Sequence, residues 1–378
     1  MRKEKQLLII FFATFFYYAF AQGELKQAKV IAPKPLQWGV NIHDGGSDPG
    51  NVANKIAKRN LKYVRMDFVG HKPDELSRFI IAAKLMNENE IKCNAILFSE
   101  FAHNRARMND YSANLNEVEQ SVYNDIKHQV LSTKDLKMDF ELQNEVSLYP
   151  DMKVKGSTGR DAIDFNTPAG RLQAAALRGM SRAVDDVRQL YKLPIRIILG
   201  TVGRDYGFLK FMQQQGVIFD VVGYHIYPWE NAASLNEDPW FGEGGLFTQL
   251  AKFNMPIQIN EFNCGEIYSG GPKHPGKDYE NKAGQPVTDA GFRSLYKHLN
   301  EIINQNVANV EGVYFYELID ELNKEVPENR FGLYYDEELK LPKISLLLAT
   351  AFAGGKLSKA EKDTLKTRGF TCFKPIER

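Results

Sequence analysis

The segment Lys137–Glu145 reads KMDFELQNE, a run of alternating polar and apolar residues that ends in the pair Asn144-Glu145. Alternation with a period of two is typical of a β-strand. Similar short runs, either alternating or wholly apolar, recur on both sides of this segment. Together they predict eight strands: Trp38–His43, Tyr63–Phe68, Lys92–Phe98, Lys137–Glu145, Ile195–Thr201, Asp220–Tyr227, Pro256–Glu261 and Gly312–Leu318.

The segments between these strands have helical character. Asp74–Asn87 carries apolar residues at i, i+3 and i+4 spacing, and Val287–Asn304 repeats that pattern. Pro168–Tyr191 follows Thr167, which predicts an N-cap with proline at the first helical position. Strands that alternate with helices predict parallel βαβ units. Eight such units within about 320 residues favour a (β/α)₈ TIM barrel, a single catalytic domain of the α/β class.

An open nucleotide-binding sheet is disfavoured by the residues after the first strand. Asn41–Ser47 lacks the G-x-G-x-x-G pattern of a dinucleotide-binding turn. The composition is that of an ordinary globular protein, with 43% hydrophobic residues and 48 Lys plus Arg against 47 Asp plus Glu. This balance indicates no strong field that would attract nucleic acid or anionic lipid.

The cysteines and histidines predict neither a metal centre nor a cofactor. The three cysteines, Cys93, Cys264 and Cys372, are too few and too scattered for a zinc ribbon or a disulfide scaffold. Four other candidate metal ligands lack the i, i+4 spacing of a zinc helix: His43, Asp44, His71 and His103.

The N-terminus has the pattern of a secretory signal peptide. Arg2, Lys3 and Lys5 precede the apolar run Leu7–Ala21, which ends in Ala19-Phe20-Ala21. An uncleaved anchor helix is the alternative, but a run of fifteen residues is shorter than the roughly 20 that cross a bilayer. We therefore expect a secreted or periplasmic protein with no membrane span after cleavage.

These features divide the chain into four parts. Residues 1–21 are the expected signal peptide, and residues 22–36 are an N-terminal extension. The expected (β/α)₈ catalytic barrel covers 37–355, and the charged residues 356–378 form a C-terminal extension.

Polar residues gather where the predicted strands end. In a TIM barrel these ends form the catalytic face. The fourth strand ends in Asn144-Glu145 and the seventh ends in Glu261. A pair of carboxylic acids at one barrel mouth is what glycosidic bond cleavage requires, because one protonates the leaving oxygen while the other attacks the anomeric carbon.

Other residues at the strand ends extend this candidate site. His225 and Tyr227 lie two apart on the sixth strand and so share one face. The second strand carries Arg65, which could instead be a structural partner of Asp67 or of another acid. His225 could likewise be a core histidine. Tyr316 on the eighth strand and Trp229 in the loop after the sixth are candidate sugar-stacking residues.

The sequence leaves the strand faces open at two places. Asp139 and Glu141 have the same parity as Glu145, and we expect them to be buried polar groups deeper in the strand. On the seventh strand Glu261 has the parity of Ile257 and Ile259. Alternation does not decide which of these sets faces the barrel axis.

In their order and position, these residues resemble the clan A retaining glycoside hydrolases, the (β/α)₈ barrels that include the family 5 and family 39 enzymes. The resemblance rests on Asn144-Glu145, His225-x-Tyr227 and Glu261. It implies that Glu145 is the acid/base, that Glu261 is the nucleophile and that Asn144 bonds the sugar 2-hydroxyl.

The resemblance further implies that Arg65 and Tyr227 hold Glu261 and that His225 lines the site. One departure concerns the end of strand eight, where many members have a tryptophan and this chain has Tyr316-Glu317.

We therefore expect a monomeric, cofactor-free hydrolase that cleaves a β-linked poly- or oligosaccharide through a covalent glycosyl-enzyme. A raised pKa at Glu145 and a low pKa at Glu261 would suit this chemistry. A transglycosylase of the same clan or a non-catalytic carbohydrate-binding barrel are the alternatives.

Overall fold

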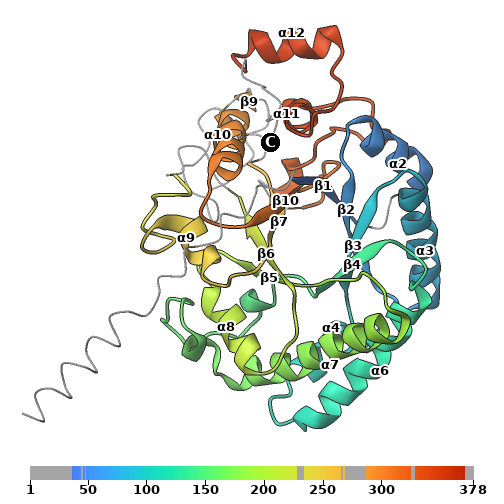
Figure 1. The fold of residues 1–378 in the computed structure, drawn as a ribbon, viewed down its shortest axis with the longest axis vertical. Coiled ribbons are helices and arrows are strands. Elements are labelled where there is room, and N and C mark those ends of the chain that lie inside the picture. Colours follow the sequence, from blue (N-terminus) through green and yellow to red (C-terminus); the bar gives the residue numbers. More distant parts are fainter. Residues whose placement is uncertain are drawn as a thin grey trace, which may run out of the picture. The chain divides into compact units, whose positions relative to one another are not determined.

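The computed structural model describes residues 36–43, 46, 48–227, 234–264, 267–268, 287–288, 290–324 and 328–370. The expected signal peptide at 1–21 and Trp229 lie outside the described residues. Eight strands close into a barrel in the order β1-β10-β7-β6-β5-β4-β3-β2, and all neighbouring strands are parallel (Figure 1). The strands are β1 Gln37–Ile42, β2 Tyr63–Phe68, β3 Lys92–Leu97, β4 Met138–Leu142, β5 Ile197–Val202, β6 Val221–Ile226, β7 Ile257–Phe262 and β10 Val310–Phe315.

The helices lie outside the ring of strands (Figure 1). They are α2 Pro49–Lys58, α3 Pro73–Glu88, α4 Glu100–His103, α5 Arg105–Met108, α6 Leu115–Ser132, α7 Pro168–Tyr191, α8 Tyr206–Gln214, α9 Gly245–Ala251, α10 Ala290–Asn304, α11 Ile344–Phe352 and α12 Lys359–Thr367. Short 3₁₀ turns form η1 Val146–Leu148, η2 Ala162–Phe165 and η3 Glu328–Arg330.

The predicted (β/α)₈ barrel is confirmed. Each of the eight predicted strand segments forms a barrel strand. Helix α7 has the predicted bounds, and the side chain of its N-cap Thr167 accepts a hydrogen bond from the Gly170 amide at 2.9 Å. The predicted helix Val287–Asn304 begins instead at Ala290, because Val287–Thr288 (β9) pairs with Ile267–Tyr268 (β8) in a small antiparallel sheet.

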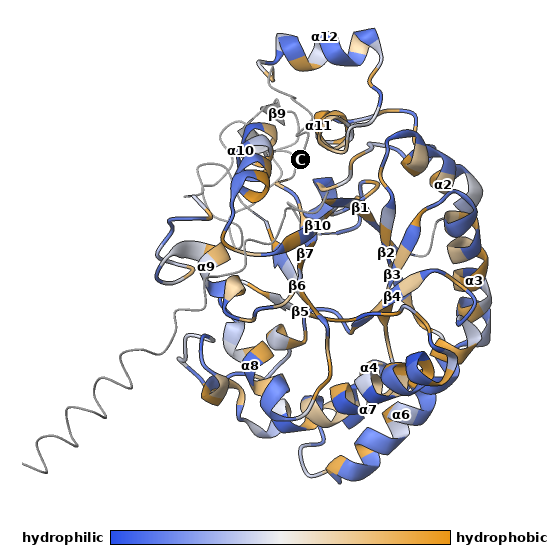
Figure 2. Ribbon diagram, in the orientation of Figure 1, coloured by the Kyte–Doolittle hydropathy of each residue, from blue (hydrophilic) through white to orange (hydrophobic). Residues whose placement is uncertain are grey.

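Apolar side chains fill the layer between the strands and the helices. Figure 2 shows apolar residues along the strands and on parts of the surrounding helices, while many hydrophilic residues face outward. Leu142 on β4, Leu172 on α7 and Phe208 on α8 are all completely buried in this layer. Burial of large apolar side chains at this interface stabilises the barrel through the hydrophobic effect.

The inside of the barrel is polar at its N-terminal end. Asp139 accepts hydrogen bonds from Lys92 Nζ at 2.7 Å and from Arg196 Nη2 at 2.9 Å. Arg196 Nη1 continues this network to Glu311 Oε1 at 2.5 Å. The expectation that Asp139 is a buried polar group is therefore confirmed, and it lies at the end of the barrel away from the catalytic face.

A β-bulge in β7 decides which side chains face the barrel axis. Tyr224 of β6 pairs with Ile259, but His225 pairs with Glu261, so Asn260 is an extra residue between the two pairs. Asn260 and Glu261 consecutively point into the barrel, whereas Ile259 belongs to the apolar layer. The bulge therefore gives Glu261 an orientation that strict alternation with Ile257 and Ile259 would not.

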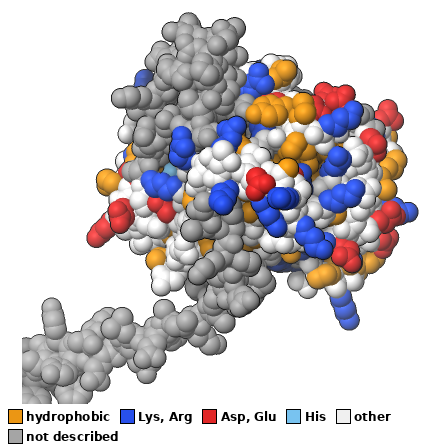
Figure 3. Space-filling model, turned by 90° about the horizontal axis from the view of Figure 1, so that it is seen from above, with side chains coloured by type: hydrophobic (Ala, Val, Ile, Leu, Met, Phe, Trp, Pro, Cys, Tyr) orange, Lys and Arg blue, Asp and Glu red, His pale blue; other side chains and the backbone are white. Residues whose placement is uncertain are grey.

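The C-terminal residues of the chain include a further helix. Helix α12 begins with a capping box, in which Ser358 and Glu361 exchange hydrogen bonds with each other's backbone amides. Its Leu365 is buried. Within the described residues, none of the helices combines the length and apolar composition needed to cross a membrane. On the face that Figure 3 shows, basic and acidic side chains are intermixed, in keeping with the balanced composition.

Candidate active site

A cavity of about 310 Å³ opens at the C-terminal ends of the strands. Six of the predicted site residues line it: Arg65, Asn144, Glu145, Tyr227, Glu261 and Tyr316. His225 lies directly beneath, with its side chain completely buried against Glu145 and Glu261. The structure therefore brings together all the predicted site residues that it describes.

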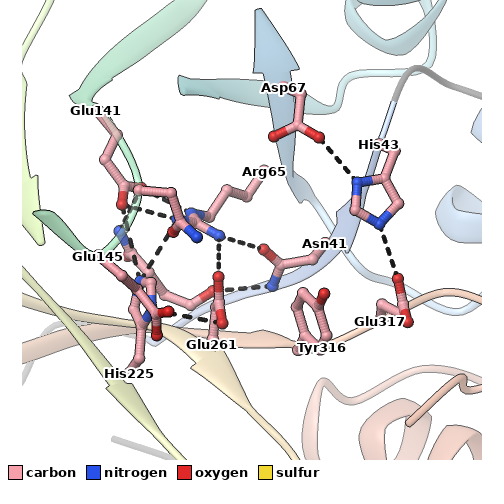
Figure 4. A network of polar contacts seen from close by, with 12 residues as sticks. Asn41, His43, Arg65, Asp67, Glu141, Glu145, His225, Glu261, Tyr316 and Glu317 are labelled. Carbon is pink, nitrogen blue, oxygen red and sulfur yellow. Dashed lines mark hydrogen bonds and ion pairs between the residues drawn. The ribbon is translucent and has the colours of Figure 1, made fainter. Parts of the chain in front are cut away.

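The guanidinium of Arg65 is the centre of the site (Figure 4). It donates to both oxygens of Glu141, at 2.7 and 2.8 Å, and to Glu261 Oε1 at 2.6 Å. It also donates to the side-chain oxygens of Asn41 at 2.9 Å and Asn144 at 2.7 Å. Arg65 is 2% exposed, so its charge is stabilised by these acceptors and not by water. Arg65 thus lines the cavity and is also the partner of a buried barrel acid, which is Glu141 and not Asp67.

Asn144 and Glu145 reach the cavity because β4 ends early. The strand stops at Leu142, and the backbone then takes positive φ values at Gln143 (57°) and Glu145 (45°). Positive φ is unfavourable for residues other than glycine and is common at functional sites. These turns let two consecutive side chains, those of Asn144 and Glu145, both face the mouth of the barrel. The predicted strand end at Glu145 is therefore wrong by three residues.

Among the described residues, Arg65 and Tyr227 hold the carboxylate of Glu261 as hydrogen-bond donors. Arg65 Nη1 contacts Oε1, and the hydroxyl of Tyr227 donates to Oε2. Asn41 fixes the bulge beside it, because its Nδ2 donates to the Asn260 carbonyl at 2.8 Å. The predicted contact between Tyr227 and Glu261 is confirmed.

Burial would lower the pKa of His225, but the surrounding carboxylates of Glu261, Glu141 and Glu145 overcome this effect and raise the pKa to about 9. Its Nδ1 lies 3.0 Å from Glu145 Oε1 and 3.4 Å from Glu261 Oε2. At neutral pH the imidazole is therefore a buried cation next to both carboxylates.

The pKa of Glu145 differs from the sequence-based expectation. Burial raises this pKa, but the hydrogen bond and charge of His225, together with the charge of Arg65, lower it below the ordinary value. Glu145 nevertheless receives fewer hydrogen bonds than the other two carboxylates, since among the described residues His225 alone donates to it. Its side chain is also the most exposed of the three, at 27%.

In the part of the chain that the structure describes, two groups of side chains have the composition of metal-ligand sets. The first is Glu145, His225 and Glu261, and the second is His43, Glu317 and Glu321. In each group a protein cation already contacts a carboxylate: Arg65 lies 2.6 Å from Glu261, and Lys324 lies 3.5 Å from Glu317. A metal ion would have to compete with these fixed charges, which makes both groups poor cation sites.

Sequence reasoning missed several residues of the cavity wall. They are Asn41, Ile42, His43, Asp67, Ile96, Glu328 and Phe331. Strand parity could have found some of them, because Asp67 lies two residues after Arg65. Phe331 directly follows the 3₁₀ turn η3, and its stacking on Tyr227 (centroids 5.1 Å apart, planes at 9°) is a tertiary contact that no local pattern indicates.

The end of β10 forms another wall of the cavity. Tyr316, joined to Glu317 by a cis peptide bond, meets Tyr227 edge to face with centroids 5.8 Å apart. Lys324 Nζ donates to the Tyr316 hydroxyl at 2.6 Å, and that hydroxyl lies 3.1 Å from Glu328 Oε1. The ring of Tyr316 is thus fixed at the position where the clan resemblance implies a tryptophan.

Comparisons with known proteins agree with this fold. No family model matches the chain, and no curated protein matches it. A family 1 beta-glucosidase from Thermotoga maritima is 12% identical to this chain, with a TM-score of 0.57, and the alignment covers 87% of this chain and 100% of the glucosidase. A beta-glucosidase from Exiguobacterium marinum is 13% identical, also with a TM-score of 0.57, and the alignment covers 86% of this chain and 99% of that enzyme. At this identity the likeness establishes the fold, and it agrees with the expected (β/α)₈ barrel.

Proposed function

We propose that the protein is a retaining glycoside hydrolase that cleaves a β-linked poly- or oligosaccharide. The observation that carries this proposal is the pairing of Glu145 and Glu261 at one cavity, with an oxygen of each carboxylate within 4.8 Å of the other. Retaining enzymes place their two carboxyl groups about 5–5.5 Å apart, whereas inverting enzymes separate them by about 6.5–9.5 Å. The solved beta-glucosidases with this fold lend further support to a carbohydrate substrate.

Glu261 is the nucleophile in this proposal. Arg65 and Tyr227 both donate to it, which stabilises its negative charge and fixes its direction. One carboxylate oxygen attacks the anomeric carbon as the bond to the leaving oxygen breaks, and a covalent glycosyl-enzyme forms. The same two donors stabilise the carboxylate again when the intermediate is hydrolysed.

Glu145 is the acid/base. Arg65 and His225 supply two positive charges against the three negative charges of Glu141, Glu145 and Glu261, which leaves one negative charge in excess. Uptake of one proton removes that excess. Among the described residues only His225 donates to Glu145, and its side chain is the most exposed of the three, so it is the carboxylate that a leaving group and water can reach. It protonates the leaving oxygen and then, as a base, activates water.

Two further features suit a sugar at this position. The Oδ1 atom of Asn144 is occupied by Arg65, which leaves the Nδ2 donor for a ligand hydroxyl. Tyr227, Tyr316 and Phe331 form an aromatic wall on which the apolar face of a sugar can pack.

A panel of β-glucans, mannans, xylans and galactans, with sizing of the products, tests the activity. Release of shorter sugars from at least one polymer is the expected outcome. No cleavage of any polymer or of the corresponding aryl glycosides would overturn the proposal and favour a non-catalytic carbohydrate-binding barrel.

Azide distinguishes the roles of the two carboxylates. Glu145→Ala should still form the glycosyl-enzyme from an aryl glycoside with a good leaving group, because departure of an acidic phenol needs no proton. Azide, which needs no base, should then rescue turnover and give a glycosyl azide of retained β configuration. Glu261→Ala should instead give the inverted α product. The opposite pattern would reverse the two assignments, and NMR of the azide product is the measurement.

A further inference from the structure

A second cavity, of about 260 Å³, adjoins the catalytic cavity. The two cavities share Asn41, Ile42 and His43 as lining residues, so they meet at the end of β1. The second cavity extends from there between the start of α2 and the residues that follow β10. Sequence reasoning gave no indication of it.

The strand order places this cavity on the side where the glycone must lie. In the closed order β1-β10-β7-β6-β5-β4-β3-β2, strand β10 is opposite β4, the strand that leads to Glu145. The leaving group must lie next to Glu145, because that residue protonates the leaving oxygen. The glycone therefore extends away from β4, over Glu261 and toward β1 and β10, where the second cavity begins.

The lining of the second cavity suits uncharged sugar rings. Asp48, Glu321 and Glu337 offer acceptors for hydroxyl groups, and aliphatic Val52 and Leu339 offer apolar surface for ring C–H groups. Sites for small polar molecules combine apolar walls with a few placed polar groups in this way.

His43 lines both cavities and lies between the carboxylates of Asp67 and Glu317 (Figure 4). Its Nδ1 contacts Asp67 Oδ2 at 2.8 Å, and its Nε2 contacts Glu317 Oε2 at 3.0 Å. Because both ring nitrogens face carboxylates, the ring is held as a doubly donating imidazolium. Its side chain is still 44% exposed, so one edge remains available to a ligand that passes over it.

We infer that the second cavity is an additional glycone subsite. The inference rests on the proposed function. A substrate would place one sugar over Glu261 and the preceding sugar beyond His43, in the second cavity. The enzyme would then prefer to cleave bonds preceded by at least two sugar units, and would not act chiefly by removing single terminal sugars.

The test uses 4-nitrophenyl glycosides with one, two and three sugar units, made from whichever sugar the polymer panel identifies. For the wild-type enzyme we expect kcat/KM to rise at least tenfold from one unit to two. In Asn51→Trp the indole should fill the second cavity. The ratio of kcat/KM for the two-unit glycoside to kcat/KM for the one-unit glycoside should then fall to near one. Asn54→Trp is the matched control, because Asn54 is an exposed residue of the same helix that lines neither cavity.

A second pair of variants covers the possibility that the tryptophan disturbs helix α2. Glu337→Ala should lower the same ratio, whereas Glu338→Ala, at the exposed neighbour outside both cavities, should keep it. A wild-type ratio near one, or a ratio that Asn51→Trp and Glu337→Ala both leave unchanged, would overturn the inference while the proposed function stands. Absence of cleavage of every glycoside would overturn the proposed function and this inference with it.

Discussion

The imidazole of His225 is completely buried among three carboxylates, and its charge sets the electrostatics of the site. Each carboxylate has a different share of the available donors. Glu141 receives two hydrogen bonds from Arg65 and one from Asn260. Glu261 receives one from Arg65 and one from Tyr227. Glu145 receives one from His225. These different sets of donors distinguish Glu141, a buried structural anion, from Glu261, the proposed nucleophile, and Glu145, the proposed acid/base.

Replacement of His225 by glutamine tests this distribution. The protonated imidazole lowers the pKa of Glu145, so its removal should raise that pKa. We expect the alkaline limb of the kcat/KM profile, which reports loss of the acid's proton, to move to higher pH in His225→Gln, with a rate on the order of tenfold lower. An alkaline limb at the same pH as in the wild type, or at a lower pH, would contradict the assignment of Glu145 as the acid. His128→Gln, at an exposed histidine on α6, is the control.

At the level of the elements, backbone irregularities do as much as side chains to build the site. The bulge at Asn260 turns Glu261 inward, and the positive φ values after β4 present Asn144 and Glu145 together. Glycine makes room for this arrangement: a Cβ on Gly223 of β6 would lie 2.7 Å from Asn260 Nδ2. The position of Glu261, the proposed nucleophile, thus depends on close packing between β6 and β7.

Gly223→Ala should therefore impair both folding and catalysis. The added methyl would displace Asn260, whose Nδ2 donates to Glu141 at 2.7 Å, and would shift the bulge that carries Glu261. Overpacking of this kind costs about 1–3 kcal/mol, and we expect kcat to fall on the order of tenfold. Gly312→Ala, where the nearest atoms are 3.3 Å away, is the control, and equal losses in the two variants would show that Gly223 has no special relation to the site. Denaturant unfolding and steady-state kinetics provide the measurements.

The strands and the position of Glu145 and Glu261 at the barrel mouth could be predicted because they depend on local patterns. Period-two alternation marks Tyr63–Phe68 and Lys137–Glu145, and the polar residues at their ends mark the mouth. The orientation of Glu261 could not be predicted, because a bulge breaks the alternation on which the reasoning depends. Glu141 is buried, as expected, but its contact with Arg65 was not predicted, nor was that of Phe331 with Tyr227, because each contact joins residues distant in sequence.

At the scale of the whole molecule, we propose that the protein is exported and loses residues 1–21. The proposal comes from the basic residues, the short apolar run and Ala19-Phe20-Ala21. When the full chain is expressed with its own N-terminus, the mass of the exported product should correspond to a chain that starts at Gln22. A product that retains Met1 and stays with the membrane fraction would favour an anchor instead.

Ion pairs tie the two ends of the barrel sequence together at the catalytic face. His43 after β1 joins Asp67 on β2 to Glu317, which follows β10. Since β1 and β10 close the barrel, these contacts bridge its first and last strands. Lys324 extends the chain of charges to Glu317 and Glu328. All of these residues except Lys324 also line one or both of the two cavities.

The protonation of His43 gives this closure a dependence on pH. Hydrogen bonds with Asp67 and Glu317 raise the pKa of His43 to about 10, against an unfolded value near 6.5. A group whose pKa is raised on folding stabilises the folded state fully below the unfolded pKa, and the contribution is lost as the pH rises through the folded pKa. His43→Gln should therefore lower Tm at pH 6.5 by about 2 °C, since His43 is partly exposed, and the difference from wild type should narrow as the pH approaches 10. A difference in Tm that stays constant from pH 6.5 to 10, measured by calorimetry, would mean that His43 stabilises the barrel by packing and not by its charge.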